Sequence, residues 1–173
     1  MKEVVPNIGE ISTKHIRLTK VDWELVKEYV CGLYVEVGTF HGASACAAVH
    51  GGASKVITID VYDWQPKVYQ SDKITFFKGT SVDFVKRYAS RKKAFVIDTL
   101  FVDGSHEFEY VMKDCESLIP FVRKGGTVLF HDHNPNNPNT GVYKAVNKYL
   151  ADIKHRKFPK VEGSGNMLVV QIQ

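Results

Sequence analysis

A glycine-containing turn near two acids is the first group of residues whose spacing suits chemistry. Glu36, Gly38 and Gly42 form the pattern E-x-G-x-x-x-G, which follows a short apolar run and leads into an alanine-rich stretch. This succession predicts a strand, a tight turn and a helix. Asp60 ends the next apolar run, and an acid about 20 residues beyond a glycine-rich turn suits hydrogen bonds to the hydroxyls of a ribose.

The spacing of the two glycines limits which nucleotide the turn could hold. Three residues separate Gly38 from Gly42, so the dinucleotide fingerprint G-x-G-x-x-G is not present there. A pyrophosphate needs that close backbone approach at the start of the helix, whereas a nucleoside without phosphates does not. The turn therefore disfavours a nicotinamide oxidoreductase and favours a nucleoside ligand.

Two later segments each join an apolar run to acids and histidines. The first reads L-F-V-D-G-S-H over residues 100–106, and the second begins at Leu118 and ends in L-F-H-D at residues 129–132. With the glycine turn and Asp60, this ordered set resembles the motifs of class I S-adenosylmethionine-dependent methyltransferases. It is most similar to the small-molecule O-methyltransferase-like branch, which includes macrocin-type sugar O-methyltransferases and cephalosporin-hydroxylase-type proteins. The resemblance covers roughly residues 33–150.

This resemblance implies methyl transfer from S-adenosylmethionine to an oxygen, or less favourably a nitrogen, of a small molecule. It also leaves open a binding module that keeps the cofactor pocket without catalysis, as a subunit of a larger assembly. The residues expected to contact the cofactor are Glu36, Gly38, Thr39, Phe40, Gly42, Ser44, Asp60, Val61, Thr80, Ser81 and Asp103. Three of these residues could have a structural role instead of a binding role. Asp60 could cap a turn, Ser81 could cap a helix and Glu36 could pair with a lysine.

The residues expected to carry the chemistry are Asp103, His106, His131 and Asp132. Asp103 could bind a metal or polarise the acceptor hydroxyl, and a histidine could remove the proton because imidazole titrates near neutral pH. Relatives that use a metal carry acids after the fourth and fifth strands, which Asp103 and Asp132 match. The tentative ligand set is Asp103, Asp132 and His133, for Mg²⁺ or for a transition metal that accepts imidazole.

The pattern around His131 departs from relatives with an adjacent acidic pair, because Asp132 stands between two histidines. If the strand continues, His131 and His133 point one way and Asp132 the other. A polar rim without a metal is the alternative interpretation of the same residues.

Strands that alternate with helices must position these residues, and this alternation predicts an α/β fold with a parallel sheet. We expect strands at 33–37, 55–60, 74–78, 99–103 and 127–131, helices at 19–30, 43–50, 82–91, 108–120 and 141–153, and a final hairpin of 158–161 with 167–172. The resemblance implies a Rossmann-like doubly wound sheet of order 3-2-1-4-5 with the antiparallel hairpin at one edge, seven strands in all. The polar residues named above then meet at the carboxyl ends of the strands, where such sheets bind ligands.

The 173 residues suit a single domain, 1–173, in which residues 1–18 could form a flap over the site. The net charge of +4 comes from scattered basic residues, so neither nucleic acid nor a membrane is expected as a partner. We expect a small-molecule acceptor, a cytoplasmic location and buried free thiols at Cys31, Cys46 and Cys115. A homo-oligomer is compatible with the short chain, because a neighbouring subunit could supply the missing lid.

Overall fold

The computed structural model describes the chain except for residues 1–4, 12–16, 64–70, 90–94, 161–162 and 165. Two short 3-10 helices, η1 (Ile8–Glu10) and η3 (Ile119–Phe121), accompany the regular elements. These elements are α1 (Lys20–Tyr29), β1 (Leu33–Val37), α2 (Ala43–His50), β2 (Lys55–Asp60), β3 (Ile74–Lys78), α3 (Ser81–Ala89), β4 (Ile97–Val102), α4 (Phe108–Leu118), β5 (Val122–Phe130), α5 (Gly141–Ala151), β6 (His155–Lys157) and β7 (Leu168–Ile172).

The described strands form one seven-stranded sheet of order β3-β2-β1-β4-β5-β7-β6, which confirms the predicted topology. β1 to β5 pair in parallel, and β7 runs antiparallel to both β5 and β6. Val37 lies beside Ile59 and Val102, and Val102 lies beside Phe130. The carboxyl ends of β2, β1, β4 and β5 therefore open at the same edge of the sheet.

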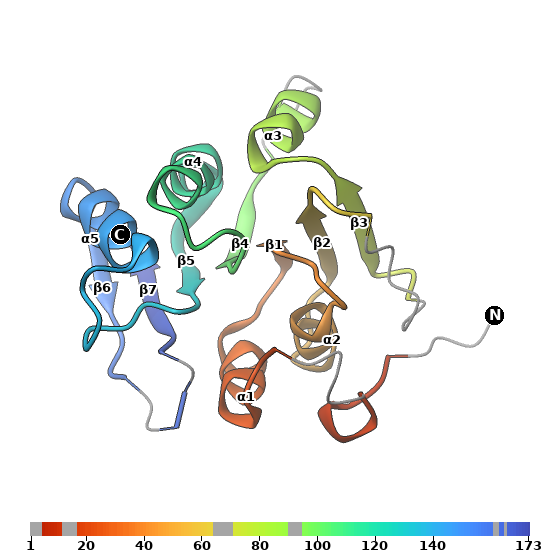
Figure 1. Cartoon of the computed structure of the whole chain (residues 1–173). Helices are drawn as coiled ribbons and strands as arrows, with labels where there is room; N and C mark the ends of the chain where they lie inside the picture. The colour runs from red at the N-terminus through yellow and green to blue at the C-terminus, as the bar shows by residue number, and fades with distance from the viewer. Residues whose placement is uncertain (1–4, 12–16, 64–70, 90–94, 161–162, 165) are drawn as a thin grey trace.

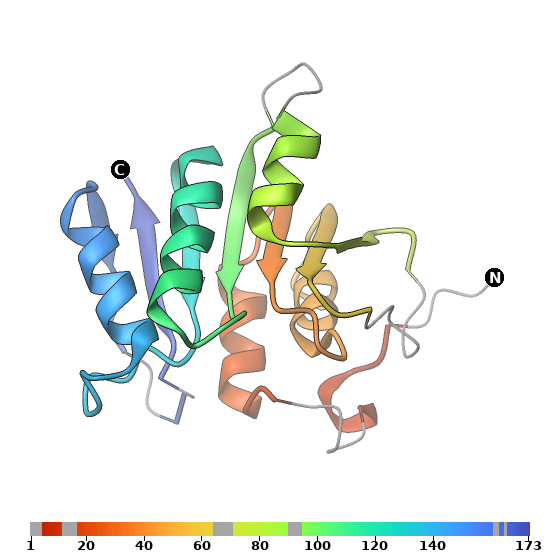
Figure 2. The same ribbon diagram turned by 45° about the horizontal axis from the view of Figure 1, so that its top comes forward.

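Helices cover both faces of the sheet, with α1 and α2 on one face and α3, α4 and α5 on the other (Figures 1 and 2). Each face has its own core: Trp23 and Ala45 belong to the first, and Phe84, Val111 and Val146 belong to the second. A parallel strand covered on both sides must be apolar on both sides, which explains the unbroken apolar runs of the central strands.

The start of α3 differs from the prediction that Ser81 caps the helix. The Thr80 hydroxyl accepts a hydrogen bond from the Asp83 amide (3.1 Å), and the Asp83 carboxylate accepts from the Thr80 amide (3.2 Å). Thr80 is therefore the cap, because it forms a reciprocal capping box with the third residue of the helix. Ser81 lies inside α3, where its side chain is available for another contact. The predicted end of this helix, at Arg91, lies outside the described residues.

The edge of the sheet also differs from the prediction, because β6 spans His155–Lys157 instead of 158–161. Phe158 still donates its amide to the Val169 carbonyl (2.9 Å), and the next residue is Pro159. A proline has no amide hydrogen to donate to the ladder, so the pairing ends there.

The described part of the N-terminal segment packs beside α1 and α2. Val5 and Ile8 contact the core on that face, and the Val5 carbonyl lies 3.0 Å from Nε2 of His50. At the start of α1, Thr19 and Asp22 form the capping box that the sequence predicts. Arg17, just before it, reaches the edge of the sheet where the strands end.

The environments of the three cysteines are only partly as expected. Cys46 and Cys115 are buried free thiols, and burial raises their pKa. Cys31 is exposed, so the prediction of a buried thiol is wrong there. In the described part of the chain, no helix has both the length and the apolar character needed to cross a membrane.

Candidate active site

The turn after β1 requires glycine at its first position. Gly38 has a φ of 94°, and a Cβ there would collide with the carbonyl oxygen of Asp103. The Gly38 amide donates to the Ile59 carbonyl (2.9 Å). Gly38 therefore lets the ends of β1, β2 and β4 come together at one point.

The Asp60 carboxylate holds this turn in place from the end of β2. Oδ2 accepts from the amides of Thr39 (2.9 Å) and Phe40 (3.2 Å), and Oδ1 accepts from the amide of Tyr62 (2.9 Å). These bonds explain how Phe40 is kept at a φ of 43°, which few side chains adopt. A carboxylate offers about four acceptor positions, so Asp60 can order the turn and still accept a ligand hydroxyl.

Glu36 lies behind the turn, fully buried among hydroxyl groups. The Tyr34 hydroxyl donates to its Oε2 (3.0 Å). Burial raises the pKa of Glu36 to about 7, although the nearby hydroxyls of Ser44, Thr58 and Tyr34 oppose this change. The described partners of Glu36 are hydroxyls, so the alternative of a lysine partner is not realised.

A cleft of about 1140 Å³ opens at this edge of the sheet. Seven residues expected to contact the cofactor line it: Gly38, Phe40, Asp60, Val61, Thr80, Ser81 and Asp103. The other four, Glu36, Thr39, Gly42 and Ser44, form the turn and the helix start around it. The cleft also reaches His106, His131 and Asp132. The turn of residues 38–42, called the nucleoside turn below, therefore shares one space with the acid–histidine group, which is Asp103, His106, His131 and Asp132.

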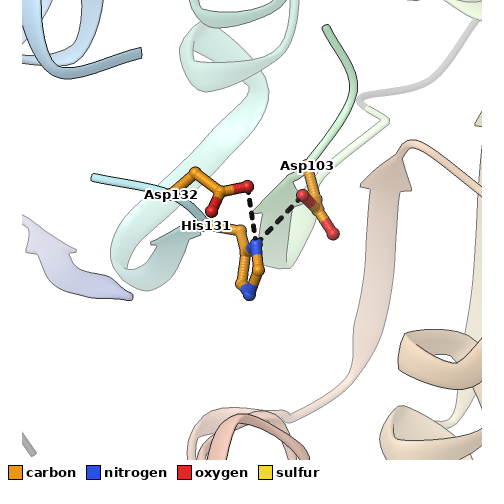
Figure 3. Close-up of side chains that lie close together, drawn as sticks. All are labelled: Asp103, His131 and Asp132. Carbon is orange, nitrogen blue, oxygen red and sulfur yellow. Dashed lines mark hydrogen bonds and ion pairs between the residues drawn. The ribbon is translucent and has the colours of Figure 1, made fainter. Parts of the chain in front are cut away.

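Asp103, at the end of β4, and Asp132, after β5, both point toward His131 (Figure 3). Nδ1 of His131 lies 3.2 Å from Oδ1 of Asp103 and 3.0 Å from Oδ2 of Asp132. On the other side of the ring, Nε2 lies 3.6 Å from Oδ2 of Asp22, which belongs to α1. Three carboxylates from three elements therefore surround one buried imidazole.

These carboxylates determine the charge of His131. Burial disfavours the charged ring, but the hydrogen bond with Asp132 and the nearby carboxylates of Asp103 and Asp22 outweigh it and raise the pKa of His131 to about 12. Burial raises the pKa of Asp103, whereas the hydrogen bond from His131 lowers the pKa of Asp132. In this arrangement His131 is a cation at neutral pH, which suits it to neutralise the acids and not to accept a proton.

His106 has a different environment on the wall of the cleft. Its Nε2 lies 3.0 Å from Oδ2 of Asp132, and 65% of its side-chain surface is exposed. A carboxylate in this position orients an imidazole toward a substrate, which is the geometry of a general base.

His133 is not part of this group, because regular alternation stops when β5 ends at Phe130. Asp132 has a φ of 56°, which turns the chain away from the strand direction. The His133 ring stacks on Tyr143 with centroids 4.7 Å apart, and its Nε2 lies 3.0 Å from Nδ2 of Asn147. A continued strand would place His131 and His133 on one side and Asp132 on the other. The structure instead brings His131 to Asp132 and directs the His133 side chain toward α5.

The candidate metal ligands change accordingly. Asp103, His131 and Asp132 each offer a ligand atom, and these atoms lie within 4.8 Å of one another. His133, which the tentative ligand set includes, is held by α5 instead.

Two buried acids of the site, Asp22 and Asp114, do not follow from the motifs in the sequence. The spacing around Asp22 indicates only a helix cap, and nothing in it points to His131. Asp114 lines the cleft from α4 and accepts a hydrogen bond from the Ser81 hydroxyl (2.6 Å). The sequence does indicate that Asp114 is buried, because this acid follows Val111 by three residues and so lies on the apolar face of the helix.

Comparisons with known proteins identify the family and the fold of the chain. The family described as "Methyltransferase domain" matches residues 35–133, more than half of the chain. An uncharacterised protein of Acanthamoeba polyphaga mimivirus is 32% identical over an alignment of 137 residues that covers 72% of this chain and 62% of the viral protein. The chain therefore spans about three fifths of the length of that curated relative.

Solved structures share the fold at low sequence identity. The O-methyltransferase of Bacillus cereus, in complex with SAH, has a TM-score of 0.65 at 15% identity, over 87% of this chain and 78% of that one. The TDP-rhamnose 3'-O-methyltransferase of calicheamicin biosynthesis has a TM-score of 0.63 at 17% identity, over 87% and 77%. With its matching family region, its sheet order and its glycine turn, the chain belongs to the family of methyltransferase domains.

Proposed function

We propose that the protein transfers a methyl group from S-adenosylmethionine to an oxygen, or less favourably a nitrogen, of a small molecule. The observation that carries this proposal is the single cleft that contains both the nucleoside turn and the group of acids and histidines. The family match supports it, as do two neighbours of the same fold whose names describe O-methyltransferases.

The cofactor fits the cleft in one direction. The Asp60 carboxylate is available to the ribose hydroxyls, and the backbone of the Gly38 turn allows close approach of the amino-acid part. The sulfonium then lies toward Asp103 and His106, which line the part of the cleft next to β4 and β5. This orientation brings the methyl group to the residues that can activate an acceptor.

Methyl transfer is an in-line displacement, in which the acceptor oxygen forms a bond to the methyl carbon as the bond to sulfur breaks. An acceptor hydroxyl must lose its proton during this step, and we assign the proton to His106, which Asp132 orients. The buried cation of His131 lets Asp103 and Asp132 both remain ionised at close range. The protein otherwise contributes by holding donor and acceptor in line.

If a divalent ion displaced the Nδ1 proton of His131, then Asp103, His131 and Asp132 would form a donor set that could hold it. Two carboxylates and one imidazole nitrogen within 4.8 Å of one another suit Mg²⁺, Mn²⁺ or a later transition metal. Such an ion would act as a Lewis acid on the acceptor oxygen. With it bound, the remaining ring proton of His131 would face Asp22, as ligating histidines usually face a carboxylate.

Isothermal titration calorimetry with S-adenosylhomocysteine, S-adenosylmethionine and NAD tests the cofactor assignment. We expect the first two to bind and NAD to give no signal. Asp60→Ala should weaken S-adenosylhomocysteine binding by about 1.5–3 kcal/mol, the range for a lost hydrogen bond to a charged group. A folded wild-type protein that binds neither adenosyl compound would overturn the proposal.

A transfer assay separates an enzyme from a binding module. Incubation with methyl-labelled S-adenosylmethionine and a panel of sugar, phenol and carboxylate acceptors should label at least one hydroxyl compound. Binding of S-adenosylhomocysteine without transfer to any acceptor would favour a module that has kept only the pocket.

A further inference from the structure

A buried polar pair, Ser81 and Asp114, lies on the wall of the cleft and is separate from the acid–histidine group in its hydrogen bonds. Ser81 comes from the first turn of α3 and is 1% exposed, and Asp114 comes from the middle of α4 and is 8% exposed. Both residues line the cleft, and the Ser81 hydroxyl donates to Oδ1 of Asp114 (2.6 Å). The steps proposed above for methyl transfer use neither side chain.

The second oxygen of Asp114 has no hydrogen-bond donor among the described residues. Oδ2 lies next to Gly104, where a Cβ would stand 3.4 Å from it. Burial raises the pKa of Asp114 to about 6, and the Ser81 hydroxyl offsets this effect only in part. A carboxylate in so apolar a position is costly unless a further donor reaches it, and the open side of Asp114 is the cleft itself.

The position of this pair matches one end of the proposed cofactor. Asp60 marks the ribose, and the acid–histidine group marks the reacting methyl. The purine base must then extend the other way, toward the wall formed by Ile59, Val61 and Val82. Ser81 neighbours Val82 in α3 and its hydroxyl contacts Asp114, whose Oδ2 lies beside Gly104, so Asp114 is within the same part of the cleft as that wall.

We propose that Asp114 accepts a hydrogen bond from the exocyclic amine of the adenine and so selects adenine over other purines. Ser81 is the positioning residue, because its hydroxyl occupies Oδ1 and leaves Oδ2 for the base. The inference rests on the proposed function, since it needs an adenosyl cofactor in the cleft. It deepens that function by assigning the selectivity for the base to a residue of α4.

The first test uses the wild-type protein with two ligands that differ only in the base. In S-inosylhomocysteine a carbonyl oxygen replaces the amine of S-adenosylhomocysteine, so it would face Oδ2 of Asp114 without a hydrogen to share. By calorimetry we expect the inosyl compound to bind about 10- to 100-fold more weakly, as expected when a buried acceptor is left unpaired. Equal affinity of the wild-type protein for the two compounds would overturn the inference, and no result from a variant protein could restore it.

The second test changes the acceptor into a group that can also donate. In Asp114→Asn the amide can donate to the carbonyl of hypoxanthine, so the preference for the adenosyl compound should fall at least about tenfold. Asp114→Ala, which can neither accept nor donate, should bind the two compounds within about threefold of each other. Glu116→Gln is the matched control, because Glu116 is an exposed acid of the same helix and should keep the wild-type preference.

The ratio of the two affinities is the informative quantity, because loosening of the cleft would weaken both ligands alike. A folded Asp114→Asn or Asp114→Ala protein that keeps the wild-type ratio would overturn the inference and leave the proposed function intact. Failure of the wild-type protein to bind either compound would instead overturn the proposed function, and the inference with it.

Discussion

The two histidines beside Asp132 differ in what they can do with a proton. His131 is buried between carboxylates that hold its charge, whereas His106 is exposed to the cleft and has its Nε2 3.0 Å from Oδ2 of Asp132. We expect His106→Ala to lower kcat by about 10²- to 10⁴-fold, the usual contribution of a general base. The affinity for S-adenosylhomocysteine should change little, which calorimetry measures. A variant with wild-type kcat would remove His106 from the mechanism.

Metal binding tests which residues hold an ion, because the structure brings together Asp103, His131 and Asp132, whereas the tentative set from the sequence is Asp103, Asp132 and His133. We expect Mn²⁺ to bind the wild-type protein, and Asp103→Asn and Asp132→Asn each to weaken binding at least about tenfold, because each removes a charged ligand. His133→Ala should bind Mn²⁺ as the wild type does, because Asn147 and Tyr143 hold that ring elsewhere. Calorimetry of the metal with the apoprotein measures all four. Loss of binding in His133→Ala, or no binding to the wild type, would contradict this assignment.

The first turn of α1 both caps the helix and places a carboxylate beside His131, and two variants test these roles. Thr19 and Asp22 cap the helix together, but only Asp22 also faces Nε2 of His131 (3.6 Å). Thr19→Ala should lower the free energy of unfolding by about 1 kcal/mol, the usual effect of a lost cap. Because the Thr19 hydroxyl also donates to Oδ2 of Asp22 (2.7 Å), this variant should lower kcat too, but less than Asp22→Asn does. Asp22→Asn should lower kcat by about 10-fold or more, as loss of a residue that orients a ligand or catalytic ring does.

Urea unfolding and initial rates of methyl transfer measure the two effects. Equal losses of kcat in the two variants would mean that Asp22 acts only through the stability of α1.

Within β1, the buried Glu36 makes stability depend on pH in a predictable direction. Its pKa is about 7 in the fold against an ordinary value of 4.5. Between these two values the folded protein keeps a proton that the unfolded chain has lost, so the free energy of unfolding falls as the pH rises. Above about pH 7 the full penalty applies, on the order of 3 kcal/mol.

Glu36→Gln removes this ionisation and keeps an oxygen that can accept from Tyr34. We therefore expect its stability relative to the wild type to increase from about pH 4.5 to about pH 7 and to stay level above. Urea unfolding of both proteins at several pH values measures the difference. A difference that is the same at every pH would show that Glu36 is not buried as a weak acid.

At the scale of the whole molecule, the cleft connects segments that are far apart in the chain. Arg17, the β1 turn, the starts of α3 and α4 and the end of β5 all line it. A ligand in the cleft stabilises all of them together. At 100 times its Kd, S-adenosylhomocysteine should add about 2.7 kcal/mol to the free energy of unfolding and raise Tm by roughly 5–10 °C. Thermal unfolding with and without ligand measures this, and an unchanged Tm would contradict binding to the folded state.

Local patterns are sufficient to predict the parallel strands and the cofactor side of the site, whereas the order of the strands is implied by the family resemblance. A buried parallel strand must be apolar on both faces, and a turn that contacts a neighbouring backbone must have a glycine, so β1, β2 and Gly38 follow from residue type and spacing alone. The carboxyl ends of parallel strands meet at one edge, which is why the positions of Asp60, Asp103 and His131 after three such strands predict that they share one cleft.

The chemical side of the site depends on tertiary structure. The turn at Asp132 has a positive φ, which directs His131 to both acids and His133 to α5, and no periodicity extends through such a turn. Asp22 and Asp114 come from helices on opposite faces of the sheet. Their distances to His131 and Ser81 follow from how α1, α3 and α4 pack, and helix packing depends on contacts between residues distant in the chain. The sequence by itself determined the parallel strands, their binding edge and the nucleoside turn, whereas packing decided which histidine is charged and which acids stand beside it.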